Sequence, residues 1–435
     1  MAVINQFPGL SYTSVTTYQV SDLANVYFLN PSTGVDFGAV INGIMTGPGK
    51  KIVLAPGTYD LTTALAVTES GTTIEGSGSG ATYLNIAAAS TADGVSFTNV
   101  SNCALKHLTV TSPTARASGN AVHVTGGDPD LPLSSYSLMD AAMVIEDVST
   151  TNQFCGILVD NDETSNYFNW RTYIRGGRHR NLSTNGYAIW INTAVGGAGE
   201  FGASQFIEDV WVGDSTAAIL AGIRLTGTGD CTLVNNEVFA TNGSYALLMD
   251  PVSGGFLTSV KVIGGFYDRC QTACMRIAPH ASVGKFGDIN LTNVWFAGST
   301  TGNAIDIVGA AAKGIYLTAC TAYSAEGSPG WCAKVDAATG VHFTAFNCAS
   351  ATTGGILFTG SASNFSVIGG EMTGAGVGTS GLTTLPTGIQ VDAGCDHYQL
   401  CNVNMSSAGV GSTAKITNTP GTAANQRIVA NNVTA

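Results

Sequence analysis

The sequence predicts an all-β chain that forms a single-stranded right-handed parallel β-helix, a solenoid of about a dozen coils. Three observations predict it. An apolar-x-apolar triplet returns at intervals of 23 to 35 residues, two-residue corners follow many of the triplets, and glycine is abundant at 55 residues while charged side chains make up only 11%. Stacked short strands joined by tight turns need this composition, whereas long helices do not.

The triplets place their first and third residues on one face of a strand, because successive side chains of a strand point to opposite faces. One such coil cannot enclose a core, but stacked coils at about 4.8 Å bury a continuous one. The triplets are Val122/Val124, Ile157/Val159, Ile189/Ile191, Ile223/Leu225, Leu247/Met249, Met275/Ile277, Ile305/Ile307, Ala333/Val335, Ile356/Phe358 and Ile389/Val391. The corners are Glu146-Asp147, Gly176-Gly177, Glu208-Asp209, Asn235-Asn236, Gly264-Gly265 and Gly369-Gly370.

Charge and hydropathy exclude two classes of partner. The chain has 435 residues and a net charge of −12, so it lacks the excess of Lys and Arg that phosphate contacts require, and we expect no nucleic-acid partner. Mean hydropathy is +0.22, but no unbroken apolar stretch reaches the length that spans a bilayer, and we expect no membrane association. The residues from Met1 to Gln6 do not resemble a signal peptide, which leads us to expect synthesis in a host cytoplasm.

The ten cysteines have irregular spacing without a CxxC pair, which favours small apolar core residues over disulfides or a metal site. Cys274 and Cys332 occupy the same register two coils apart, about 10 Å, which is too far for a disulfide. The six histidines are scattered, and we expect structural roles for them. No metal and no cofactor is expected.

Three motifs near the N-terminus resemble the opening of pectate-lyase-like β-helix proteins. They are residues 36–40 (DFGAV), 51–59 (KIVLAPGTY) and 71–78 (GTTIEGSG), in the family's order. The family usually has a helix of a dozen or more residues between the first two motifs, so the short interval here predicts a short or missing capping helix. Residues 1–35 show no triplets and are expected to be an extended lead-in or attachment segment, with the β-helix domain at 36–435.

Three consecutive coils are longer than the others, and each has its extra residues directly after the triplet strand. These three excursions are residues 126–138, 160–170 and 192–204. Because they leave neighbouring coils at the same corner, we expect them to stack into a wall along one edge. Loops on a rigid scaffold are common positions for binding and catalytic residues.

The second excursion has the richest chemistry. Glycoside hydrolysis needs two carboxylates, and lyase action on uronates needs a base and a cation that neutralises the sugar carboxylate. The catalytic candidates are Asp160, Asp162, Glu163 and Arg171. Sugar binding uses aromatic faces and polar groups, for which the candidates are Asp128, Asp130, Tyr136, Tyr167, Trp170, Arg178 and Glu200. Three roles stay open for these residues: solvated loop or subunit-contact residues, a binding site, and a catalytic site.

A second choice for catalysis comes from the corners. Asp147 and Asp209 occupy equivalent corners two coils apart, at a separation from which carboxylates can approach the range that inverting hydrolysis uses. The alternative is that each aspartate hydrogen-bonds to the amides of its own turn.

The pectate-lyase-like superfamily includes pectate lyases, polygalacturonase-like hydrolases, inulin fructotransferases and phage tailspikes and depolymerases. Within this superfamily the chain is most similar to virion tail proteins. The features that it shares with them are its low charge, its richness in Ala, Thr and Gly, and its N-terminus. The resemblance implies a homotrimeric tailspike or tail-fibre-like protein that binds host surface polysaccharide, and it leaves open whether the protein also depolymerises that polysaccharide. It would contact other tail proteins through its N-terminal segment. The alternatives are a purely structural virion or decoration protein, and a free enzyme: a polysaccharide lyase, a glycoside hydrolase or an inulin-fructotransferase-like protein. The stretch 38–42 (GAVIN) is similar to the last of these.

Overall fold

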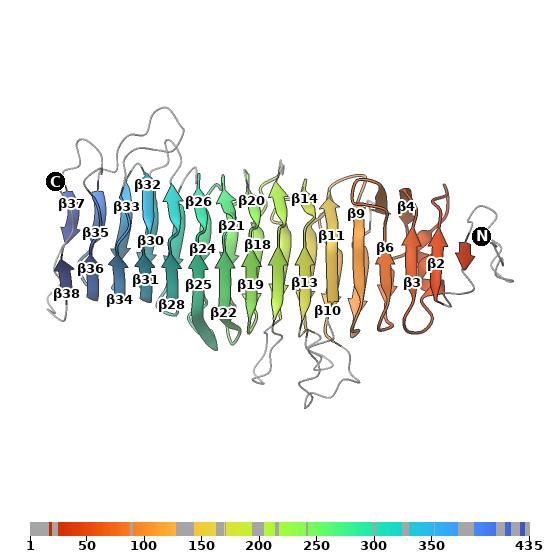
Figure 1. The fold of residues 1–435 in the computed structure, drawn as a ribbon, viewed down its shortest axis with the longest axis horizontal. Coiled ribbons are helices and arrows are strands. Elements are labelled where there is room, and N and C mark those ends of the chain that lie inside the picture. Colours follow the sequence, from red (N-terminus) through yellow and green to blue (C-terminus); the bar gives the residue numbers. More distant parts are fainter. Residues whose placement is uncertain are drawn as a thin grey trace. The chain divides into compact units, whose positions relative to one another are not determined.

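The computed structural model describes residues 17–19, 25–87, 90–127, 143–161, 169, 171–193, 204–213, 217–240, 242–298, 302–323, 330–351, 353–372, 387–405, 414–418 and 427–430. The described residues up to Gly213 form one compact unit and those from Ala217 onward form a second. Each unit is a stack of parallel strands, which confirms the predicted parallel β-helix. Figure 1 shows the strands of each unit stacked side by side.

In the first unit, one sheet carries the triplet strands and a second sheet carries the remaining strands. The triplet sheet contains β5 (Leu65–Val67), β8 (Val95–Thr98), β10 (Asn120–Thr125), β12 (Cys155–Asp160) and β15 (Tyr187–Asn192). The other sheet contains β1 (Thr17–Gln19), β2 (Val26–Leu29), β3 (Lys51–Leu54), β4 (Gly57–Leu61), β6 (Thr73–Glu75), β7 (Thr82–Ile86), β9 (Ala104–Thr111), β11 (Met143–Thr151), β13 (Thr172–Arg175), β14 (Arg178–Arg180), β16 (Gln205–Glu208) and β17 (Trp211–Gly213). The parallel stack begins at β2, which pairs with β3, whereas β1 pairs with β2 in the antiparallel direction.

The second unit repeats this plan. Its triplet strands are β18 (Ala221–Gly227), β21 (Tyr245–Met249), β24 (Ala273–Ile277), β27 (Ile305–Val308), β30 (Trp331–Asp336), β33 (Gly354–Thr359), β35 (Thr387–Val391) and β37 (Ala414–Asn418). Its other strands are β19 (Cys231–Val234), β20 (Glu237–Phe239), β22 (Phe256–Ile263), β23 (Phe266–Asp268), β25 (Lys285–Thr292), β26 (Trp295–Ala297), β28 (Lys313–Thr318), β29 (Thr321–Tyr323), β31 (Thr339–Thr344), β32 (Asn347–Ser350), β34 (Ser363–Ile368), β36 (Asp396–Cys401) and β38 (Arg427–Ala430).

The triplets form the cores of both units, as predicted. Ile157 and Val159 of β12 are completely buried, and Ile157 pairs with Ile189 of β15 in the predicted register. Two earlier coils of the same kind escaped the sequence analysis. They begin at Leu65 in β5 and at Val95 in β8, and they pair with each other and with β10.

The predicted corners adopt the left-handed conformation that a sharp turn between strands requires. Asp147, Asp209 and Asn235 have φ values of 49°, 54° and 50°, a region that Asn and Asp tolerate better than most residues. At Gly177 φ is 87°, and a Cβ there would collide with the backbone oxygen of Val148. The glycine is therefore required at that corner by conformation and by space.

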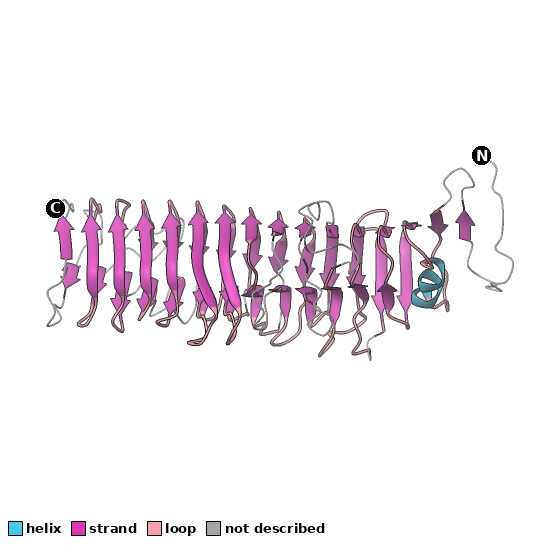
Figure 2. Ribbon diagram, turned by 90° about the horizontal axis from the view of Figure 1, so that it is seen from below, coloured by secondary structure: helices cyan, strands magenta, loops and turns pink. Residues whose placement is uncertain are grey.

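A single short helix occurs among the described residues, α1 (Phe37–Ile44), and Figure 2 shows it at the N-terminal end of the strands of the first unit. The predicted short helix is confirmed. Asp36 is its N-cap and accepts a hydrogen bond from the Gly38 amide at 3.1 Å, and its carboxylate also accepts from the amides of Thr62 and Thr63. The motif at 36–40 therefore has a structural role: it fastens the helix to the first coils.

The ten cysteines are buried thiols, as predicted, and Cys274 and Cys332 are among them. No helix formed by the described residues is long and apolar enough to cross a membrane.

Candidate functional site

The outward-facing residues of three neighbouring triplet strands form the candidate site. Val122 and Val124 of β10 point into the core, so the residue between them, His123, points outward. The register aligns Thr125 at the end of β10 with Asp160 at the end of β12, and β8 with β10 on the other side. The coils thereby bring together side chains that are 30 and 37 residues apart in sequence.

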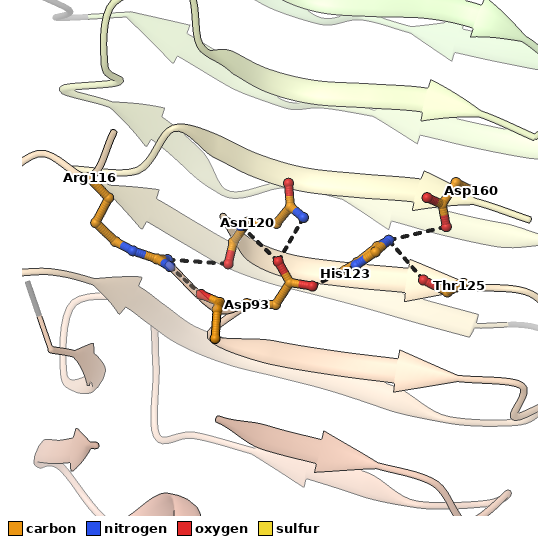
Figure 3. Close-up of polar contacts among 7 residues, drawn as sticks. Asp93, Arg116, Asn120, His123, Thr125 and Asp160 are labelled. Atoms are coloured by element: carbon orange, nitrogen blue, oxygen red, sulfur yellow. Dashed lines mark hydrogen bonds and ion pairs between the residues drawn. The ribbon is translucent and has the colours of Figure 1, made fainter. Parts of the chain in front are cut away.

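His123 lies between two carboxylates, as Figure 3 shows. Its Nδ1 lies 2.6 Å from Oδ2 of Asp93, which comes just before β8, and its Nε2 lies 3.1 Å from Oδ1 of Asp160. Thr125 places its hydroxyl oxygen 2.8 Å from the same Nε2. The three charged side chains are 20–24% exposed, so they are shielded from water yet open to a ligand.

The two carboxylates stabilise the imidazolium form of His123. Burial by itself lowers the pKa of His123, but the hydrogen bonds and negative charges of Asp160 and Asp93 outweigh burial and raise it to about 9. At neutral pH the ring therefore carries a proton on each nitrogen and donates to both sides. Burial raises the pKa of Asp93, but the hydrogen bond and charge of His123 reverse this, so the net shift is downward.

The two aspartates have different surroundings. Oδ1 of Asp93 accepts from the backbone amide of Asn120 at 2.9 Å and from Nδ2 of Asn120 at 2.7 Å, while Oδ2 accepts from His123. Asp93 is thus saturated with hydrogen bonds and orients the ring. Asp160 holds the other ring nitrogen through Oδ1 and stands where the second excursion begins. Its position suits a carboxylate that meets a ligand.

A buried arginine holds the segment that precedes Asp93. Arg116 is only 1% exposed, and its guanidinium donates to the carbonyl oxygens of Ser90, Ala92 and Asn120 and to Oε1 of Gln153. These bonds fix the chain directly before Asp93, and the charge of Asp93 in turn opposes the lowering of the Arg116 pKa by burial. Figure 3 shows Arg116 and His123 on opposite sides of Asp93.

Of the catalytic candidates from the sequence, Asp160 lies in this cluster, whereas Arg171 lies at the start of the other sheet, 6.0 Å from the ring centre of Tyr173. Arg178 on β14 lies 6.0 Å from the ring centre of Trp211, also on that sheet. The remaining candidates fall outside the described residues: Asp162, Glu163, Asp128, Asp130, Tyr136, Tyr167, Trp170 and Glu200. Thr125, Asp160 and Asn192, which end β10, β12 and β15, align in register, so these three strands end at the same corner as predicted. The wall expected from the three excursions lies outside the described residues.

The second-choice aspartates occupy the predicted corners. Asp147 accepts a hydrogen bond from the Ser79 hydroxyl at 2.9 Å and lies 3.5 Å from Nδ1 of His107. The adjacent Glu146 and Glu208 flank Arg175 in register, as the two-coil spacing predicts. Arg175 pairs with Glu208 at 3.3 Å, and Lys106 pairs with Glu146 at 3.0 Å, so opposite charges alternate along these strands.

Sequence reasoning missed Asp93 and His123. The middle residue of each triplet faces outward, and aligning these middle residues along the coils gives the column Ser96, His123, Leu158 and Trp190. The sequence signal that could have identified the site is therefore a histidine in that outward-facing column, on the strand that neighbours the one ending at Asp160.

The pKa of His123 predicts how the stability of the first unit depends on pH. The folded pKa lies above the ordinary value of 6.5, so the stabilisation is complete below about pH 6.5 and is lost as the pH rises to about 9. We expect the free energy of unfolding to fall by about 2–3 kcal/mol over that range. Urea denaturation at a series of pH values measures this, and the His123→Gln variant should lose the alkaline decline.

His179 provides an internal comparison of opposite sign. Its ring is completely buried, and burial lowers its pKa to about 4. Its contribution is therefore complete above about pH 6.5 and is lost as the pH falls toward 4. The His123→Gln variant should keep this acid decline. An alkaline decline that persists unchanged in the variant would contradict the assignment of the raised pKa to His123.

Comparison of the sequence with protein-family models and with curated proteins finds no match. Solved structures do match. The A-module of the mannuronan C-5 epimerase AlgE6 of Azotobacter vinelandii superposes with a TM-score of 0.57 at 14% identity, covering 92% of this chain and 96% of that one. The A-module of AlgE4 of the same organism gives a TM-score of 0.54 at 15% identity, with coverages of 90% and 96%. Tailspike protein 3 of bacteriophage CBA120 gives a TM-score of 0.52 at 11% identity, with coverages of 92% and 59%. At these identities the likeness is one of fold, and it confirms the expected resemblance to β-helix proteins.

Proposed function

We propose that this protein binds a polysaccharide across the outer face of its triplet sheet and transfers protons from and to the sugar through Asp160 and His123. The observation that carries the proposal is the imidazolium of His123, held at 2.6 Å and 3.1 Å by two carboxylates on a partly exposed strand face. A buried ion pair that served stability alone would not need to face the edge from which three excursions leave.

The residues of the cluster suit an acidic sugar. The positive charge of His123 neutralises the carboxylate of a uronate, which acidifies the proton on the adjacent ring carbon. Asp160 takes that proton as the base. The imidazolium then donates a proton to the glycosidic oxygen in an elimination, and the proton on Asp160 passes to Nε2 of His123, 3.1 Å away, which restores both groups. Asp93 holds the ring in place throughout.

The fold neighbours support this class of ligand. Two of them are named as mannuronan epimerases and one as a phage tailspike, and all share the parallel β-helix at 11–15% identity. Fold alone does not determine function, so the weight lies on the cluster.

We further propose that the chain acts as a tailspike or tail-fibre-like virion component that engages a host surface polysaccharide as a homotrimer. Exposed apolar side chains on the second unit support association with further copies: Ile263, Phe266 and Tyr316 are 43%, 48% and 43% exposed. Light scattering should then give three times the chain mass of 44.4 kDa. A monomer at micromolar concentration would exclude the trimer.

The test of the proposed function uses a panel of polymannuronate, polygalacturonate and bacterial capsule and O-antigen polysaccharides in deuterated water. Deuterium at the carbon beside the sugar carboxylate without fragmentation indicates epimerisation, and ultraviolet absorbance of an unsaturated uronate indicates elimination. New reducing ends without that absorbance indicate hydrolysis by the two aspartates instead. Binding without any conversion would leave a receptor-binding role. The absence of both binding and conversion across the whole panel would overturn the proposal.

A further inference from the structure

Two buried asparagines lie directly beneath the point at which Asp160 leaves its strand. Asn161 and Asn169 are 9% and 4% exposed, although an amide side chain in a core is costly unless its polar atoms are paired. Nδ2 of Asn161 donates to the carbonyl oxygen of Thr193 at 2.6 Å, and Oδ1 of Asn161 accepts from the amide of Asn169 at 2.8 Å. Both polar atoms of Asn161 are therefore used.

Asn169 extends the network in two further directions. Its Nδ2 donates to the carbonyl oxygen of Gly126 at 3.5 Å, and its Oδ1 accepts from the hydroxyl of Thr172 at 2.9 Å. The side chain of Gln205 donates to the backbone oxygen of Asn169 at 3.0 Å. The side chains of Asn161, Asn169 and Gln205 are called the amide clamp below.

The partners of the amide clamp are the described residues at which the chain departs from and returns to the stack. Gly126 begins the first excursion, Asn161 and Asn169 lie near the two ends of the second, and Thr193 and Gln205 lie close to the two ends of the third. One network therefore ties the bases of all three excursions to one another. A buried polar network of this kind restrains the arrangement of the groups that it joins.

The amide clamp also acts on the candidate site. Asp160 is the last residue of β12, where a strand would otherwise fray, and the side chain of the next residue fixes the chain in two directions. The Gly126 amide donates to the carbonyl oxygen of Asp160 at 3.0 Å. Gly126 is therefore hydrogen-bonded both to Asn169 of the amide clamp and to the reactive residue.

We propose that the amide clamp of Asn161, Asn169 and Gln205 positions Asp160 against His123. These are positioning residues, since they act through Asp160 and do not face the outer surface. The inference rests on the proposed function only in treating Asp160 as reactive.

The test follows the protonation of His123 by NMR and needs no substrate. The resonance is assigned by its loss in His123→Gln. In the wild-type protein we expect a pKa of about 9. In Asn161→Ala the Asp160 carboxylate should move away, so the pKa should fall by about one unit or more, a tenfold change in proton affinity. Thr172→Val, which removes one bond to Asn169, should give a smaller fall and serves if Asn161→Ala does not fold.

The matched control is Ile189→Val on β15, a completely buried core residue next to the same strand. It should lower the melting temperature while leaving the His123 pKa unchanged. If Asn161→Ala and Thr172→Val behave like this control, the clamp only stabilises the fold and the inference is overturned. A shifted His123 pKa in a protein that neither binds nor converts any polysaccharide of the panel would instead support the clamp while rejecting the proposed function.

Discussion

Replacing His123 with glutamine should reduce the conversion of the polysaccharide by about 10²–10⁴-fold, the range over which a positioned acid or base contributes. Glutamine keeps a polar side chain at the site but provides no proton to donate and no positive charge to face a uronate. The measurement is the initial rate on whichever polysaccharide the panel identifies. His342→Gln is the matched control, because His342 is also partly exposed on a strand but lies in the second unit, with Nδ1 2.9 Å from the Ser366 hydroxyl.

The two aspartates should separate in the same assay. Asp160→Asn removes the base and should cost as much activity as His123→Gln, whereas Asp93→Asn keeps a hydrogen-bond acceptor beside Nδ1 and should retain part of the rate. Both variants should lower the pKa of His123, because each removes one of the charges that raise it. Equal and small effects of all three substitutions would show that the cluster is a structural ion pair.

The fold was predictable from local patterns because a solenoid repeats its core. Each triplet, such as Ile305/Ile307, fills the same place in the coil, so one pattern read ten times carries most of the architecture. The coils at Leu65 and Val95 were missed because β5 and β8 are only three and four residues long and precede the first triplet that stands out.

The site was less predictable, because its residues come from three coils. Asp160 was found since it ends a triplet strand and begins an excursion. Asp93 and His123 carry no motif: a histidine between two valines is unremarkable until the register places it between two carboxylates. Asn161 and Asn169 were also invisible as a pair, because an asparagine in a loop sequence is usually solvated, and only burial shows that these two are not.

The interior of the first unit contains more buried polar residues than that of the second, a difference that the composition of the whole chain does not show. Of the 19 buried polar or charged residues among those that the structure describes, 15 lie in the first unit, and Arg116, His179 and Gln205 are among them. In the second unit the core is built from aliphatic triplets and ring stacks such as Phe358 on Phe365, with centroids 3.8 Å apart. Buried polar groups cost stability unless they are paired, so their concentration in the unit that carries Asp160 and His123 fits a site that needs fixed geometry.

The largest effect on stability should come from Arg116. Arg116→Met should lower the free energy of unfolding of the first unit by about 3–5 kcal/mol, because it removes every hydrogen bond that the guanidinium donates and leaves buried oxygens unpaired. Methionine fills much of the same volume, so the loss reports the hydrogen bonds and charge. Arg116→Lys should recover only part of the loss, since an ammonium group cannot reproduce the planar array of donors.

The comparison variant is Arg180→Met on β14, where the arginine is exposed and substitution should change stability by no more than about 0.5 kcal/mol. Urea denaturation followed through the first unit measures both. Because Arg116 fixes the carbonyl oxygen of Ala92 immediately before Asp93, the folded fraction of Arg116→Met should also have a lowered His123 pKa. If Arg116→Met loses stability but keeps the His123 pKa, Arg116 stabilises the core without positioning Asp93. If Arg116→Met is as stable as Arg180→Met, the buried guanidinium is replaceable.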